Sequence, residues 1–199
     1  DGNTIVNFPP QDDWNTLFAG PGNSFDDVFL DDHALPDPTI FKGGDKDFHA
    51  LKDMGCVTKN NPVGKLDIRY AYAGAYQVGG DVVVIYGQNR ETNEGDAAMG
   101  FWFFQDAVSC DSNVGTWTGS KRDGDLLIIT PYSNGGTDQT AELYRWNDPT
   151  PASPERGDET LTLISSLSLS CVASSPDHHS ENPDLCATTH AVAISTDWD

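Results

Sequence analysis

Residues 96–106 decide the fold, and they read Asp-Ala-Ala-Met-Gly-Phe-Trp-Phe-Phe-Gln-Asp. Apolar and aromatic side chains occupy both the odd and the even positions of this stretch. Because successive side chains of a strand point to opposite faces of its sheet, we expect this strand to be covered on both faces. The residues before it, 87–96, are rich in carboxylates and side-chain amides. The sequence therefore predicts a β-sandwich whose loops hold hard cations.

Short strand patterns bounded by turn residues continue along the chain. Alternation is strict over 69–78, where three tyrosines fall on one face and three alanines on the other. Gly79-Gly80-Asp81 then predicts a β-hairpin that leads into 82–86. Further strands are predicted at 97–105, 125–130, 139–146, 159–169 and 187–196. No stretch has the period of a long amphipathic helix, so we predict an all-β, antiparallel β-sandwich or jelly roll.

The domain organisation follows from length and composition. A chain of 199 residues with 37% hydrophobic content is sufficient for one core. Residues 1–38 are rich in Asp, Asn, Gly and Pro and hold only isolated apolar side chains. They are predicted to form an irregular acidic N-terminal arm with short strands, and residues 39–199 to form the sandwich domain.

The charge of the chain excludes one class of partner. It holds 11 basic and 31 acidic side chains, a formal charge of −20, which repels nucleic-acid phosphates and anionic lipid. Of the acids, 25 are Asp and 6 are Glu, and Asp is the residue of turns and calcium loops. No apolar run approaches the roughly 18 residues needed to span a bilayer. We expect no nucleic-acid binding and no membrane insertion.

The four cysteines indicate an oxidising compartment. Cys56, Cys110, Cys171 and Cys186 have no Cys-x-x-Cys spacing, which favours two disulfides over a zinc site. Cys171 is predicted to pair with Cys186 and close a loop that otherwise has nothing apolar to hold it. Cys56 and Cys110 then pair by exclusion. A start at Asp1 rather than Met fits a processed secreted protein or a module of a longer chain.

A series of motifs carries a resemblance to a known family. They are Thr39-Ile40-Phe41-Lys42-Gly43-Gly44, Tyr70-Ala71-Tyr72-Ala73, Val84-Ile85-Tyr86-Gly87, Asn93-Glu94-Gly95-Asp96, Gly100-Phe101-Trp102-Phe103-Phe104-Gln105, Asp123-Gly124-Asp125-Leu126-Leu127, Asn134-Gly135-Gly136-Thr137, Leu143-Tyr144-Arg145-Trp146 and Leu185-Cys186-Ala187-Thr188 with Trp198. From residue 39 onward the chain resembles a family of secreted bacterial surface modules that commonly precede immunoglobulin-like or prealbumin-like repeats. The resemblance implies a concanavalin-like jelly roll and an extracellular, adhesive or structural role, without naming a ligand.

Two groups of oxygen-bearing side chains are candidate calcium ligands. The first is Asn89, Asn93, Glu94 and Asp96, beside the flexible Gly95. The second is Asp26, Asp27, Asp31 and Asp32, whose carboxylates repel one another without a cation. Calcium takes about six to eight such oxygens and tolerates irregular loops. The alternative is that both groups are solvated, with side chains that cap turns or face water.

Aromatic side chains offer a second kind of site. Tyr70, Tyr72 and Tyr76, together with Trp102, are candidates for a platform that stacks on sugar rings, as in a lectin. In the other interpretation these rings fill the core between the sheets, while the alanine face is pressed against a covering layer. Regular alternation is first of all a packing signal, so the second interpretation is favoured.

The sequence offers little for catalysis. Glycosidases need two carboxylates that face each other across a cleft. Glu91, Glu94 and Asp96 are the only acids bunched with Glu next to a strand, and they precede the strand instead of lying along it. No nucleophile elbow, phosphate loop or Cys-His arrangement is present. We expect no enzyme, and a polysaccharide hydrolase of the jelly-roll type is the lowest-ranked alternative.

These observations together predict a secreted or cell-surface, non-enzymatic β-sandwich module that calcium stabilises. Its role would be extracellular assembly or adhesion, with copies of itself or other surface components as partners. At a charge of −20 such chains approach each other closely only when cations neutralise their loops. A lectin-like module that binds glycans is the alternative.

Overall fold

Antiparallel strands make up most of the part of the chain that the structure describes. The computed structural model describes residues 23–32, 40–42, 48–57, 62–78, 80–92, 95–111, 113–133, 138–149 and 159–169. Within these ranges every strand pairing is antiparallel. The helical turns that lie completely within them are two short 3₁₀ turns, η2 (Leu51–Asp53) and η3 (Gly64–Leu66). The prediction of an all-β antiparallel fold is confirmed, and no helix of the described part is long and apolar enough to cross a membrane.

The first sheet has the strand order β1-β4-β5. It consists of β1 (Asp26–Asp31), β4 (Ile68–Val78) and β5 (Asp81–Arg90). The predicted hairpin is confirmed, since Val78 pairs with Asp81 across a turn in which Gly80 has a φ of 106°. β1 lies in the expected N-terminal arm, and it pairs with β4 along its whole length.

The second sheet has the order β11-β10-β9-β6. Its strands are β6 (Ala97–Phe103), β9 (Leu126–Ser133), β10 (Asp138–Asn147) and β11 (Thr160–Leu169). The strand patterns in the sequence predicted these four elements to within a few residues. The strand predicted at 187–196 lies outside the described residues.

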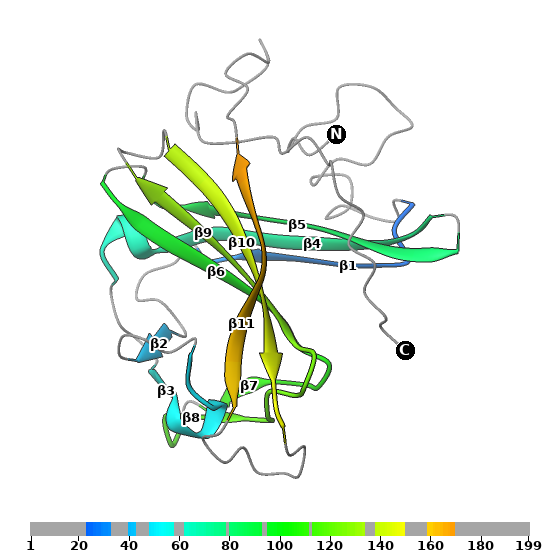
Figure 1. Cartoon of the computed structure of the whole chain (residues 1–199). Coiled ribbons are helices and arrows are strands. Elements are labelled where there is room, and N and C mark those ends of the chain that lie inside the picture. The colour runs from blue at the N-terminus through cyan, green and yellow to red at the C-terminus, as the bar shows by residue number, and fades with distance from the viewer. Residues whose placement is uncertain are drawn as a thin grey trace.

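The two larger sheets run across one another in a sandwich-like arrangement (Figure 1). Contacts between aromatic side chains join them. Tyr86 lies opposite Ala73 in the first sheet, and its ring centroid is 4.7 Å from that of Phe101 and 5.4 Å from that of Phe103 in the second. Trp102, between those two phenylalanines in β6, contacts Trp146 at 6.3 Å. Side chains on both faces of β6 therefore make contacts, as the sequence of this strand predicted.

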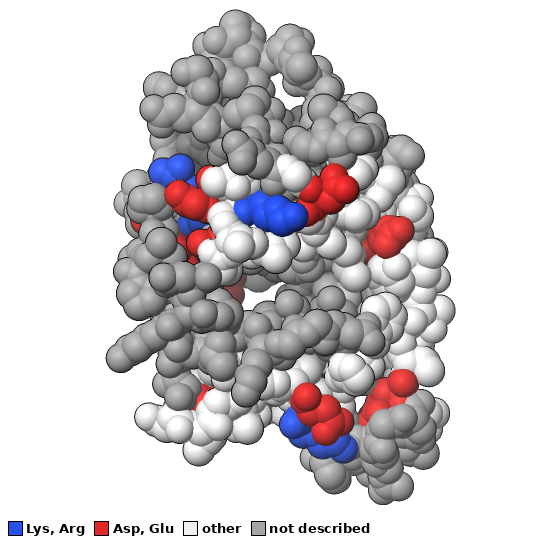
Figure 2. Space-filling model, turned by 90° about the vertical axis from the view of Figure 1, so that its left-hand side faces the viewer, with Lys and Arg blue, Asp and Glu red and all other residues white. Residues whose placement is uncertain are grey.

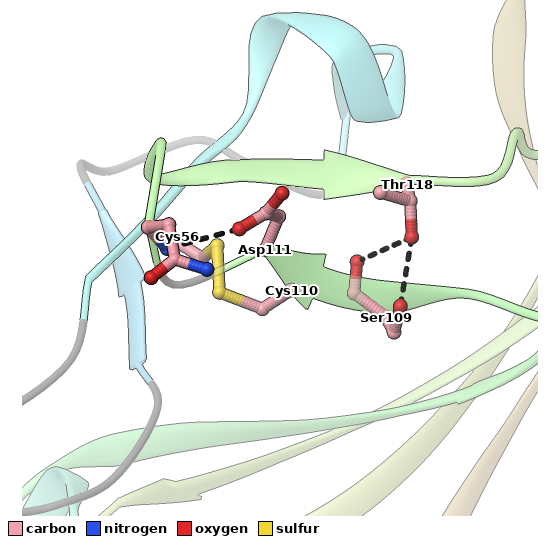
Figure 3. Close-up of a disulfide and its surroundings, with 6 residues drawn as sticks. Cys56, Ser109, Cys110, Asp111 and Thr118 are labelled. Atoms are coloured by element: carbon pink, nitrogen blue, oxygen red, sulfur yellow. Dashed lines mark hydrogen bonds between the residues drawn. A yellow bond between two sulfur atoms is a disulfide. The ribbon is translucent and has the colours of Figure 1, made fainter.

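A third, smaller sheet was not predicted. It has the order β2-β3-β8-β7, and its strands are β2 (Ile40–Lys42), β3 (Gly55–Val57), β8 (Thr116–Thr118) and β7 (Ser109–Asp111). Strands of three residues give no periodicity to read. A disulfide between Cys56 and Cys110 joins β3 to β7, with a Cα–Cα distance of 6.1 Å (Figure 3). That pairing is confirmed, whereas Cys171 and Cys186 lie outside the described residues.

Hydrogen bonds fix the turn beside this disulfide. The Asp111 carboxylate accepts a bond from Asn113 N at 2.9 Å, and Gly115 N donates to Asp111 O at 2.8 Å. Cys56 N in turn donates to Gly115 O at 3.1 Å. Gly115 has a φ of 72°, and a Cβ at this position would lie 3.1 Å from Cys56 O, so glycine suits this turn on both counts. The turn thus holds Cys56 in position to meet Cys110.

Removal of this crosslink is expected to destabilise the protein strongly. The bond closes a loop with a sequence separation of 54, and a loop of that size corresponds to about 4 kcal/mol of stabilisation through the unfolded state. A Cys56→Ser, Cys110→Ser double variant should therefore unfold at a much lower urea concentration than the parent. A Cys171→Ser, Cys186→Ser variant serves as the comparison, because the shorter loop predicted for that pair corresponds to a smaller loss of about 3 kcal/mol. An unchanged midpoint in the first variant would contradict the expectation.

Candidate functional site

The four acids predicted as a cation site on β1 are spread along a strand. Successive residues of a strand face opposite ways, so Asp26 lies on one face of the sheet and Asp27 on the other. Asp27 and Asp31 share a face, but at the rise of a strand they are about 13 Å apart, with Phe29 between them. Asp27 accepts a hydrogen bond from Ser24 Oγ at 2.8 Å. β1 alone thus does not bring these carboxylates to one point.

β1 is held on the sheet by its backbone and by Phe29. Phe25 N donates to Ala75 O and Asp32 N to Arg69 O, each at 2.9 Å, so both ends of the strand are tied to β4. The ring of Phe29 stacks on that of Tyr72 at 5.9 Å and an interplanar angle of 11°. These contacts fix the acid-flanked strand in one register, with Phe29 opposite Tyr72.

The second predicted cation site is only partly described. Asn89 lies in β5 opposite Tyr70, Asp96 is exposed just before β6, and Asn93 and Glu94 lie outside the described residues. Across the described ranges, no three His, Cys, Asp or Glu side chains are grouped as metal ligands would be. The structure therefore does not assemble either predicted calcium site within the part of the chain that it describes.

Basic side chains lie beside the loop that precedes β6. A Cβ placed on Gly95 would lie 3.6 Å from Lys65 Nζ, and Arg69 Nε is 3.9 Å from Glu91 Oε2. Two backbone bonds also tie the start of the loop to the η3 region, from Glu91 N to Asp67 O and from Thr92 N to Gly64 O. On the face seen in Figure 2, each visible Lys or Arg lies beside an Asp or Glu. Part of the negative charge at this edge is thus balanced by the chain itself.

The tyrosine row lies on the face of the first sheet that turns away from Tyr86. Residues directly opposite one another share a face, so Tyr72 lies with Phe29 and Gly87, whereas Tyr86 lies with the alanines. The favoured expectation that the tyrosines fill the space between the two sheets is therefore wrong in its choice of face. The small alanine side chains, and not the rings, are on the side that meets the second sheet.

The tyrosines pack against one another and their neighbours. Tyr72 is 3% exposed, and Phe29, Tyr70, Tyr76 and Ile85 pack against it. Its ring lies over Gly87, where an added Cβ would come within 2.2 Å of the ring. Any side chain at position 87 would displace the ring, so the cluster depends on this glycine.

Trp102, the fourth residue of the predicted sugar platform, lies in the other sheet. Its ring stacks on Phe104 at 5.3 Å and an interplanar angle of 3°. The Lys121 ammonium lies 4.2 Å from the Trp102 centroid and 4.3 Å from the Trp146 centroid, and it donates to His49 O at 2.6 Å. The structure thus does not join Trp102 with the three tyrosines in one surface.

Lys121 is a central residue that the sequence did not reveal. It is 2% exposed, although a lysine in the run Ser-Lys-Arg-Asp-Gly-Asp reads as a solvated turn residue. The turn that follows positions it, because the buried Asp125 carboxylate accepts bonds from Arg122 N at 2.8 Å and from Gln105 N and Nε2 at 3.0 Å. Asp125 therefore serves as a turn residue. Lys121 lies over two indole rings, where a cation is attracted to the ring faces.

The alanine face of the first sheet carries exposed aliphatic side chains. Val28 and Leu30 of β1 are 48% and 58% exposed, and Val82 and Val84 of β5 are 55% and 45% exposed. Register places all four on the same face as Tyr86. Figure 1 shows that this sheet continues past its crossing with the second sheet toward the β4–β5 hairpin. Four exposed aliphatic side chains on one face of a sheet differ from the single, scattered apolar residues that are normal on a surface.

A double-mutant cycle is expected to show that Lys121 and Trp146 are coupled. Lys121→Met and Trp146→Leu should each lower the free energy of unfolding. The loss in the double variant should be smaller than the sum of the two single losses by about 1–2 kcal/mol, because either change alone removes the same cation–ring contact. Urea unfolding of the four proteins measures the coupling. Lys121→Met combined with Leu163→Ala, which changes an exposed side chain of β11, is the additive comparison. Additivity of the first pair would contradict the cation–ring contact.

The hydrogen bond between Tyr144 and Glu142 can be tested through the pKa of Tyr144 at alkaline pH. Burial raises this pKa above its ordinary value of 10.0, and the hydrogen bond from Tyr144 Oη to Glu142 Oε2 and the negative charge of Glu142 raise it further. The folded state thus holds the phenolic proton more tightly, so this contribution to stability is complete below pH 10.0 and is lost as the pH rises through the folded pKa. In an ultraviolet titration, Tyr144→Phe should remove a late-ionising tyrosine, and Glu142→Gln should lower its pKa. Identical titrations of the two variants and the parent would refute the assignment.

No family model matches the chain, and no curated protein or solved structure matches it either. The features that bear on function are therefore the exposed aliphatic face, the acids of β1 and the disulfide. The resemblance to secreted surface modules stays an expectation.

Proposed function

We propose that this chain is a secreted or cell-surface, non-enzymatic β-sandwich module that acts in extracellular assembly or adhesion. The observation that carries the proposal is the exposed aliphatic face formed by Val28, Leu30, Val82 and Val84. Contiguous exposed apolar side chains on a folded domain mark a surface that binds another molecule. A disulfide between Cys56 and Cys110 agrees with an oxidising, extracellular location.

The proposal includes finer features of the fold. The two larger sheets would belong to a concanavalin-like jelly roll, and Cys171 would pair with Cys186 as a second disulfide. The resemblance to secreted surface modules supports the jelly roll, and the even number of cysteines supports the second bond.

Calcium would act in this proposal mainly on the acids of β1. Asp26 and Asp27 project from opposite faces of the strand, and no closed cage forms around them within the described residues. A divalent cation would therefore neutralise carboxylates at the surface and bridge them to acids of another chain. With a net charge of −20, this neutralisation removes much of the repulsion between copies.

Lectin-like binding of glycans is less well supported by the geometry. Tyr72 is almost fully buried, and Trp102 lies in the other sheet in contact with Lys121. An assembly or adhesion surface needs only the aliphatic face and the acids beside it, which the described residues provide.

The proposal is tested by the particle mass and the melting temperature of the same non-reduced sample in EDTA and in millimolar calcium. Calcium should raise both values, because a cation that binds the folded chain and its assemblies stabilises them by mass action. Sodium chloride at matched ionic strength separates bridging from simple screening. A protein that keeps the same mass and melting temperature in EDTA, calcium and sodium chloride would not be a calcium-linked assembly module.

A further inference from the structure

The exposed aliphatic face has three parallel rows of side chains. The middle row belongs to β4, where the small side chains of Ala71, Ala73 and Ala75 lie on this face and Gln77 follows them near the hairpin. Val28 and Leu30 of β1 stand opposite Ala73 and Ala71 on one side. On the other side, Val84 of β5 stands opposite Ala75 and Val82 opposite Gln77, while Tyr86, which packs on Phe101 of the second sheet, stands opposite Ala73. Larger aliphatic side chains thus border a row of methyl groups along the strand direction.

Such a profile suits a single elongated segment. The low alanine row leaves space for side chains of a partner, and the valines and Leu30 on either side supply apolar walls. A partner segment of one strand or one helix fits the width of three strands, since neighbouring strands lie about 4.8 Å apart.

The charge around this face selects the partner. Asp26 is exposed and lies on the same face as Val28 and Leu30, whereas Asp27, also exposed, lies on the opposite face of the strand. Between Ala71 and Gln77 the face holds no basic side chain, and Arg69, at its end, is next to Glu91. Electrostatic complementarity therefore favours a segment that carries lysine or arginine beside its apolar residues, and it disfavours a second copy of a chain with a charge of −20.

We propose that this face docks an elongated, cationic and apolar segment of another protein, which makes the module a receptor for basic surface components. The proposal rests on the assembly or adhesion function proposed above and specifies its partner. Apolar contact with Leu30, Val28, Val82 and Val84 supplies affinity, and Asp26, on the same face, supplies the preference for positive charge.

The direct test is a titration of the full chain with two fluorescent peptides, one of alternating valine and lysine and one of alternating valine and glutamate. The lysine peptide should bind, more weakly as salt is added, and the glutamate peptide should not. Leu30→Ser and Val84→Ser should each weaken binding by roughly 5- to 30-fold, the effect of losing one buried aliphatic side chain. Asp26→Asn should weaken it by roughly 2- to 5-fold.

Leu163→Ser provides the matched control, because Leu163 is 49% exposed in β11 of the other sheet. It should leave peptide binding unchanged. Equal binding of the two peptides, equal losses in Leu163→Ser and Leu30→Ser, or no binding of the lysine peptide would each overturn the proposal. All these variants change exposed side chains, so they are expected to fold.

Light scattering of the same proteins separates this proposal from the broader one. If calcium raises the mass of the parent, and Leu30→Ser and Val84→Ser abolish that rise, the face is occupied by a second copy, and the choice of a basic partner is overturned. If the mass still rises in these variants but the lysine peptide does not bind, the assembly function stands and this docking surface fails. If neither assembly nor peptide binding is observed, both proposals fail.

Discussion

The buried Lys121 ammonium is the constraint on which the packing of the second sheet depends. A charge that is taken out of water must find compensating partners, and here these are two indole faces and the carbonyl of His49. The two tryptophans come from β6 and β10, and His49 comes from the segment before η2. One cation therefore fixes three distant parts of the chain relative to one another, and the Asp125 turn fixes the cation.

The distribution of charge explains how a strongly acidic chain can still present an apolar surface. Near the η3 turn and the loop before β6, Lys65 and Arg69 lie close to the chain's own acidic region. Arg122 forms an ion pair with Asp106 at the turn that leads into β9. β1 holds acids without a basic residue in the strand itself, and it borders the aliphatic face. The acids of β1 thus lie close to the aliphatic face, where their charge acts on any molecule that approaches it.

Strict periodicity made much of the fold predictable. The alternation of tyrosine and alanine over 69–78 and the glycines after it gave β4, the hairpin and β5, because a two-residue period has only one structural meaning. The pairing of Cys56 with Cys110 followed by exclusion from the cysteine count. The strands of the small sheet could not be predicted, since three residues are too few to show a period.

The candidate site was less predictable, because it depends on contacts between strands that are far apart in the sequence. Alternation shows that Tyr72 and Ala73 face opposite ways, but only Tyr86 against Phe101 reveals which face meets the other sheet. Four aspartates within seven residues look like one cluster, whereas an extended backbone separates them. Lys121 gave no signal at all, because its burial is decided by tryptophans from two other strands.

The Cys56–Cys110 bond also determines how the module would respond to tension. The loop that this bond closes contains β4, β5 and β6, and in the proposed assembly role tension would act through the ends of the chain. While the bond is intact, the loop between the two cysteines, with a sequence separation of 54, cannot be extended by force. The fully extended chain is therefore shorter by about 180 Å. The hairpin and the decisive strand would therefore stay tethered to one another under load, even after the flanking strands had been pulled away.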